Sequence, residues 1–66
     1  MVVAFERRKQ HLSQEALAGR AAVHRTHLSD IEAGKVRVSL DVAKRVADAL
    51  GVPLSALLER TERLAE

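Results

Sequence analysis

The polar side chains best suited to specific binding lie in one short stretch, residues 24–35, which reads HRTHLSDIEAGK. Its only large apolar residues, Leu28 and Ile31, are three apart, which is the spacing of a buried stripe on a helix. At about 100° per residue, Thr26, Ser29 and Asp30 point away from that stripe. A merely solvated face usually carries Glu and Lys at i,i+4 spacing. Short hydroxyls, a carboxylate and a neighbouring arginine instead favour a face that makes directed hydrogen bonds to a partner.

Metal binding or acid–base catalysis is an alternative use of the same stretch. His24 and His27 are three residues apart, and Asp30 follows at the same spacing. A structural or catalytic metal needs further ligands, and catalysis needs a nucleophile or a phosphate cradle, none of which is evident nearby. We therefore expect no metal, no cofactor and no enzymatic activity.

Length and composition predict one small globular domain. The 66 residues are 47% hydrophobic and 30% charged, with no cysteine, and no apolar run approaches the length of a membrane span or signal peptide. We therefore expect a cytoplasmic protein with no membrane partner and no small-molecule ligand. Residues 1–35 carry six Lys/Arg against four Asp/Glu, whereas residues 36–66 carry five of each. This modest basic bias is compatible with an anionic partner, or with none.

The apolar periodicity predicts five helices and no strand. They cover residues 2–10, a segment beginning after the N-cap Ser13, the stretch ended by Gly34, a segment from Ser39 to Gly51, and residues 53–65. The inward positions expected for the second to fifth helices are Leu17, Ala18, Ala21, Leu28, Ile31, Leu40, Ala43, Val46, Ala47, Leu50, Leu54, Leu57, Leu58, Thr61, Leu64 and Ala65. Only Ala22 and Val23 separate the second helix from the third, so a sharp corner must join them.

The segment SQEALAGRAAVHRTHLSDIEAGK, residues 13–35, closely resembles the XRE-type helix-turn-helix domains of phage repressor and Cro proteins. Matches continue through Ser39-Leu40 and the ALGV of residues 49–52, so the resemblance covers about residues 3–58. It implies an all-α, compact five-helix, lambda-repressor-like DNA-binding domain over residues 1–66. The helix-turn-helix motif would occupy about residues 14–33, with a fifth helix at about 53–65 as a candidate dimer interface.

Several positions depart from the family pattern. The corner usually has glycine where this chain has Ala22, and alanine there is strained by roughly 1 kcal/mol if its backbone is left-handed. The N-cap of the third helix is commonly Ser or Thr, but here it is His24. In the first helix and its exit, Glu6 and His11 replace an aliphatic residue and a glycine.

In the resembled family, the second helix of the motif lies in the major groove of DNA, and its first residues contact base edges. Carried over by position, this assigns base contacts to Arg25, Thr26 and Asp30. Arginine donates bidentately to guanine, and the threonine methyl can contact thymine. Asp30 would accept from cytosine or would hold Arg25 or His27 in place. The resemblance implies phosphate contacts by Gln14, His27, Ser29, Lys35 and Arg37.

The resemblance implies one structural assignment, and the apolar pattern of the fifth helix gives another. Arg7 and Glu32 would form a partly buried ion pair between the first and third helices. The apolar stripe of the fifth helix outruns the needs of the core, and its residues Leu57, Thr61 and Leu64 would join two copies of the chain. Four cations are expected on plain solvated surface: Lys44, Arg45, Arg60 and Arg63.

The resulting functional hypothesis is a sequence-specific regulator of transcription that binds double-stranded DNA. It would bind a palindromic operator as a homodimer. Small free-standing members of the family include phage Cro proteins, antitoxins and the controllers of restriction-modification operons, and the stretch from His24 through the VRVSL of residues 36–40 most resembles the controllers. The alternative is an antitoxin-like module that uses the same fold to bind a protein.

Overall fold

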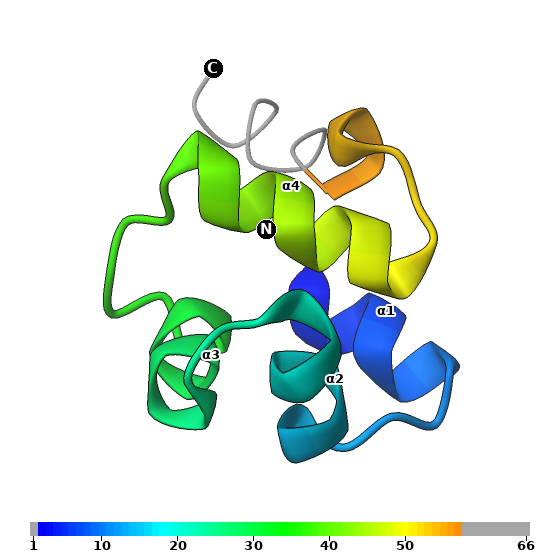
Figure 1. The fold of residues 1–66 in the computed structure, drawn as a ribbon, viewed down its shortest axis with the longest axis horizontal. Coiled ribbons are helices and arrows are strands. Elements are labelled where there is room, and N and C mark those ends of the chain that lie inside the picture. The colour runs from blue at the N-terminus through cyan, green and yellow to red at the C-terminus, as the bar shows by residue number, and fades with distance from the viewer. Residues whose placement is uncertain (1, 58–66) are drawn as a thin grey trace.

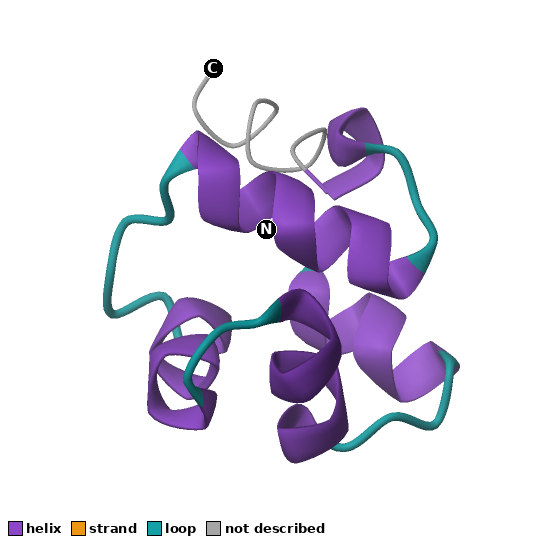
Figure 2. Cartoon of the chain, in the orientation of Figure 1, coloured by secondary structure: helices purple, strands orange, loops and turns teal. Residues whose placement is uncertain are grey.

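A computed structural model of the chain describes residues 2–57. Four helices are defined over this range: α1 (Val3–Lys9), α2 (Gln14–Ala21), α3 (Arg25–Glu32) and α4 (Leu40–Leu50). Residues 54–57 are also helical. Figure 1 shows α4 running across α2 in the view, and Figure 2 shows only helices and loops over the described residues. The predicted all-α architecture is confirmed, and the predictions for Thr61 and Leu64 lie outside the described residues.

The helix ends follow the local signals of the sequence. The hydroxyl oxygens of Ser13 and Ser39 each accept a hydrogen bond from the backbone N–H three residues later, at 3.0 and 3.2 Å. These bonds satisfy N–H groups that have no partner inside the helix. Gly34 follows α3 with a φ of 73° and Gly51 follows α4 with a φ of 70°. Both glycines adopt the left-handed conformation that ends a helix at little cost.

The core forms where α2 meets α3 and α4, while α1 packs against α4. Leu17, Leu28 and Val46 contribute fully buried side chains from α2, α3 and α4, respectively. The remaining members of the buried core cluster are Val3, Ala18, Ala21, Ile31, Ala47, Leu50 and Leu57. The predicted inward faces of α2 and α3 are therefore correct.

The prediction for Leu40 is wrong, because 68% of this residue is exposed. Leu40 is the first residue of α4 and continues the apolar stripe that Ala43 and Ala47 bury farther along the helix. Periodicity identifies the face of a helix, but it does not say how far along that face the neighbouring elements reach. Among residues 2–57, no element covers Leu40 at the start of α4.

Leu57 fits its expected inward position but not its expected place in a dimer interface. This residue, predicted to join two copies of the chain, is fully buried in the core of a single chain. Its side chain therefore has no surface to offer to a second copy. The helical turn over residues 54–57 completes the hydrophobic core instead.

Candidate nucleic-acid interface

The corner between α2 and α3 depends on one left-handed residue. Ala22 has a φ of 56° and a ψ of 43°, and the N–H of Val23 donates to the carbonyl oxygen of Ala18 at 3.0 Å. This arrangement ends α2 and redirects the chain within the three residues 22–24. The strain considered for Ala22 from the sequence is therefore present, since a Cβ is unfavourable in this conformation.

His24 forms the N-cap of α3. Its backbone is extended (φ −69°, ψ 139°), and its Nδ1 accepts a hydrogen bond from the backbone N–H of Thr26 at 3.3 Å. A ring nitrogen that accepts cannot carry a proton, so in the neutral ring the proton is on Nε2. Histidine thus replaces the usual Ser or Thr cap, and the exposed ring lies beside the first turn of α3.

The first turn of α3 presents Arg25 and Thr26 to solvent. Within residues 2–57 neither side chain has a hydrogen-bond or ion-pair partner. The turn also contains no acidic residue, although carboxylates are what the positive end of the helix dipole favours. An arginine in this position does not stabilise the helix, but it adds to the dipole in attracting an anion.

His27, Ser29 and Asp30 are half-buried along the flanks of α3. Asp30 forms no ion pair with either Arg25 or His27 among the described residues, so the proposal that it holds one of them in place is wrong for this structure. Its carboxylate therefore remains available as an acceptor.

The opposite side of α3 is fixed to α1 by the predicted ion pair. Arg7 Nε donates to Glu32 Oε2 at 2.8 Å and its Nη2 donates to Oε1 at 3.0 Å, which is a bidentate pair. The side chains are only 11% and 6% exposed. Arg7 Nη1 also donates to the carbonyl oxygen of Leu12 at 2.8 Å. This single guanidinium thus joins α1, the α1–α2 connection and α3.

Gln14, expected at a phosphate, belongs to the same network. Its Nε2 donates to Glu32 Oε1 at 3.0 Å, which links the start of α2 to the end of α3. Burial raises the pKa of Glu32, but the hydrogen bonds from Arg7 and Gln14 outweigh it, and the pKa lies below its ordinary value. The hydrogen bond to Glu32 in turn raises the pKa of Arg7. Any phosphate contact by Gln14 would have to use its remaining amide hydrogen or its backbone N–H.

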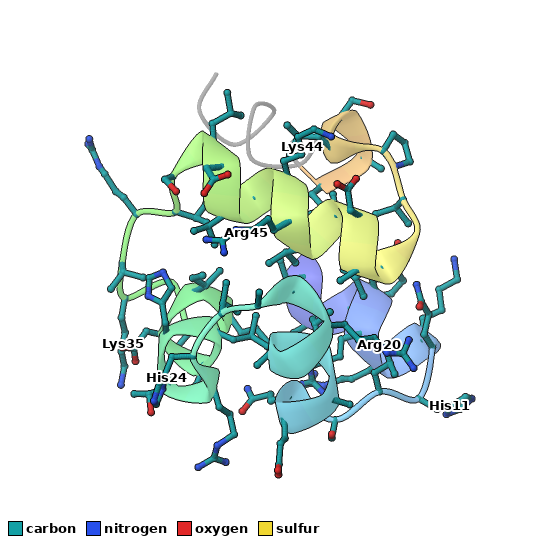
Figure 3. All side chains as sticks on the ribbon, viewed as in Figure 1. His11, Arg20, His24, Lys35, Lys44 and Arg45 are labelled. Carbon is teal, nitrogen blue, oxygen red and sulfur yellow. The ribbon has the colours of Figure 1, made fainter. Side chains whose placement is uncertain are left out.

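The loop after α3 carries Lys35 and Arg37, both exposed. In Figure 3, Lys35 and His24 lie on the α3 side of the molecule, whereas Arg20 and His11 lie on the far side. The predicted contact residues of α3 and its following loop therefore come from adjoining segments. Arg20 of α2 is therefore not part of this surface.

Sequence analysis missed one residue at the corner itself. Arg45, expected on plain surface, donates from Nη1 to the carbonyl oxygen of Ala22 at 3.1 Å. The two residues are 23 positions apart, and the face of α4 that meets the corner is set by tertiary packing. The sequence drew attention to the corner only through Ala22, which stands where the family usually has glycine, and it gave no sign of a partner on α4.

Two further observations bear on function. Over residues 2–57, no group of three or more His, Cys, Asp or Glu side chains is arranged to hold a metal ion. None of the described helices is both long and apolar enough to span a bilayer.

These elements define a helix-turn-helix domain: α2 and α3 are joined by a three-residue corner, residues 22–24, and α2 packs against both α3 and α4. A family model described as Helix-turn-helix matches residues 4–57, which is most of the chain. The chain belongs to this family of XRE-type, DNA-binding regulators.

The chain is similar to two proteins named as control proteins. It is 47% identical over 53 residues to control protein C.BamHI of Bacillus amyloliquefaciens, covering 80% of this chain and 65% of that protein. It is 39% identical over 59 residues to control protein C.MunI of a Mycoplasma species, covering 89% of this chain and 80% of that protein. The immunity repressor protein of Bacillus phage phi105 is 38% identical over 52 residues, or 79% of this chain and 36% of the repressor. The match thus spans just under two thirds of the first of these relatives.

Proposed function

We propose that this protein is a sequence-specific regulator of transcription that binds a palindromic operator in double-stranded DNA as a homodimer. The observation that carries the proposal is the division of α3 into two faces. Leu28 and Ile31 are buried and Glu32 is held by an ion pair, while Arg25 and Thr26 are exposed without a partner among the described residues. A helix that is packed against the core on one face and exposed on the other can enter the major groove of DNA with its first turn leading.

Each predicted contact residue has its own chemical role in this proposal. Arg25 donates two hydrogen bonds to guanine O6 and N7, and the Thr26 methyl group contacts a thymine methyl. Asp30 accepts from cytosine N4. His27, Ser29, Lys35 and Arg37 contact phosphates, which fixes the register of α3 without reading sequence, and Gln14 adds a phosphate contact at the start of α2.

A homodimer follows from the small footprint of one short recognition helix. Two copies related by a twofold axis would place their α3 helices about 34–36 Å apart, one turn of the duplex, and would bind a palindromic site. Thr61 and Leu64 stay our candidates for the interface, whereas Leu57 does not. Sedimentation showing only monomer at tens of micromolar, with and without operator, would contradict the dimer.

The similarity to proteins named as control proteins favours a controller of a restriction-modification operon as the biological role. Since such a role is exercised on cellular DNA, we expect the protein to act in the cytoplasm. No step of this proposal requires a catalytic group, a cofactor or a small ligand.

The experiment begins by selecting the sites that the wild-type protein retains from a random duplex pool. Enrichment of one motif with twofold symmetry is the expected result. Failure to enrich any sequence would remove the proposal of sequence-specific binding and favour the protein-binding alternative.

The second step separates base reading from phosphate binding with Arg25→Ala and Arg37→Ala, titrated against the selected site and a scrambled duplex at several salt concentrations. Arg25→Ala should cost roughly 1–3 kcal/mol on the selected site and relax preference at one base pair. Arg37→Ala should weaken both duplexes about equally and lower the salt slope by about 1 per protomer. An equal loss on both duplexes for Arg25→Ala would mean that Arg25 binds phosphate only.

A further inference from the structure

The corner that directs α3 into its position receives a hydrogen bond from a helix outside the helix-turn-helix motif. Arg45, in the second turn of α4, extends toward the connection between α2 and α3, and its Nη1 lies 3.1 Å from the carbonyl oxygen of Ala22 (Figure 3). No other side chain among the described residues has a hydrogen bond to the corner's backbone carbonyls. The bond is therefore a specific link between α4 and the corner.

The corner needs this link more than a glycine-containing corner would. Ala22 is left-handed at φ 56°, a conformation that is unfavourable for a residue with a Cβ. Its carbonyl lies just beyond the last turn of α2, where carbonyl groups lack partners inside the helix and where the dipole is negative. A guanidinium in this position satisfies a carbonyl and places a positive charge at the favourable end of α2.

A carboxylate on α4 orients the guanidinium. Asp41, one turn earlier, lies 3.4 Å from Arg45 Nη2 through its Oδ2, which leaves Nη1 directed to Ala22. Arg45 is the more sheltered partner, with 42% of its side chain exposed against 81% for Asp41. Two contacts, one through each terminal nitrogen of the guanidinium, thus restrict the flexible side chain of Arg45.

We propose that Arg45 is a positioning residue for DNA recognition: by holding the Ala22 carbonyl it fixes the peptide plane from which α3 departs, and thus the angle at which Arg25 and Thr26 meet the bases. This inference rests on the proposed function. A direct phosphate contact by Arg45 is the competing role, and the two roles differ in what their loss does to specificity and to salt dependence.

The same helix supplies a matched control. Lys44 and Asp48 form an i,i+4 pair at 3.5 Å, with 67% and 68% of their side chains exposed, and Lys44 has no bond to the corner. Lys44→Ala therefore removes one positive charge and one surface pair from α4, as Arg45→Ala does, but leaves the Ala22 carbonyl bonded. Asp41→Asn and Asp48→Asn form a second matched pair that keeps both cations.

The test measures affinity of all four variants and Arg45→Lys for the selected operator and for scrambled duplex, at a temperature where circular dichroism shows each variant folded. Arg45→Ala should lower the ratio of operator to scrambled affinity by about 3- to 10-fold, the effect of one ordinary hydrogen bond. Lys44→Ala should leave the ratio unchanged. Asp41→Asn should lower the ratio less than Arg45→Ala does, Asp48→Asn should not lower it, and Arg45→Lys should recover part of the loss.

A second readout does not depend on DNA. Amide hydrogen exchange at Val23, whose N–H donates to Ala18, should be faster in Arg45→Ala than in Lys44→Ala when followed by NMR, because only the former releases the corner. This readout can be interpreted even if the wild-type protein does not discriminate between the two duplexes. That failure to discriminate would contradict the proposed function, not the link between Arg45 and the corner.

Two results would overturn the inference. Equal ratios and equal exchange in Arg45→Ala and Lys44→Ala would show that the link does not position α3. An equal loss on both duplexes with a salt slope lowered by about 1, restored by Arg45→Lys, would assign Arg45 to a phosphate. If Arg45→Ala is not folded, the Asp41→Asn and Asp48→Asn pair decides between the same outcomes.

Discussion

Glu32 offers the sharpest test of how the recognition helix is held. Replacing it with alanine removes both hydrogen bonds from Arg7 and the one from Gln14. The Arg7 side chain, only 11% exposed, would then be a largely buried charge without its partner. Breaking a buried pair in this way costs about 3–5 kcal/mol. At roughly 0.05–0.15 kcal/mol per residue, a 66-residue chain has only about 3–10 kcal/mol of stability.

Urea denaturation followed by circular dichroism measures this cost directly. Glu32→Ala should be partly unfolded at 25 °C even without urea, so that most of its unfolding transition is no longer seen. Glu32→Gln, which keeps the shape and one carbonyl acceptor, should have a free energy of unfolding between those of Glu32→Ala and wild type. The double variant Arg7→Met/Glu32→Met should be more stable than Glu32→Ala, because it leaves no buried charge unpaired. In the double variant the amide of Gln14 still loses its acceptor and the carbonyl oxygen of Leu12 loses its donor. At about 1 kcal/mol for each lost bond, recovery should stay incomplete.

The pH dependence gives an independent measure of the same pair. Because the pKa of Glu32 is lowered in the folded chain, its stabilising contribution is fully present above the unfolded pKa of about 4.3. It is lost as pH falls through the folded pKa. The difference in Tm between wild type and Glu32→Gln should therefore be constant near neutral pH and shrink below about pH 4.

An unchanged unfolding midpoint in Glu32→Ala would refute this reasoning, since it would mean that the pair is solvated or absent in solution. A double variant no more stable than Glu32→Ala would refute the more specific claim that the unpaired Arg7 charge causes the loss.

Substitutions at three further positions have expected outcomes. Ala22→Gly should relieve the left-handed strain and stabilise the chain by up to about 1 kcal/mol, a rise in Tm of about 4–8 °C by calorimetry, and a fall would contradict the assigned conformation. His24→Ala should cost about 0.5–1 kcal/mol, given the long 3.3 Å capping bond, while His24→Ser should restore Tm; equal Tm values for the two variants would exclude the cap. Leu57→Ala should cost about 2–5 kcal/mol independently of protein concentration, as a fully buried side chain requires, and a concentration-dependent loss would point to an interface.

Those features of the fold that depend on local rules were predictable from the sequence. Ser13 and Ser39 mark the starts of α2 and α4, and Gly34 and Gly51 mark helix ends, because capping and left-handed backbone depend on a few adjacent residues. Period alone placed Thr26 on the exposed side of α3, whereas Ser29 and Asp30, expected on the same side, are half-buried. The resemblance to a known family supplied the ion pair, which links residues 25 positions apart.

What the sequence did not predict depends on how far one element reaches along another. Leu40 continues an apolar stripe beyond its cover. Leu57 is inward as its period indicated, but it is buried in the core of one chain rather than between two copies. The bonds of Arg45 to the corner and of Gln14 to Glu32 require two elements to meet at one point. Periodicity gives the direction of a side chain but not the distance to its partner.

The polar contacts around α3 explain how recognition can be separated from stability. At the start of the helix, His24 caps it and Arg45 holds the preceding corner; at its end, Glu32 is held by two side chains from other elements. None of these contacts uses the side chains of Arg25 or Thr26. Substituting either residue should therefore change stability by no more than about 0.5 kcal/mol while changing which duplex is bound. A large loss of Tm in Arg25→Ala would show instead that a residue proposed to contact bases also holds α3 in place.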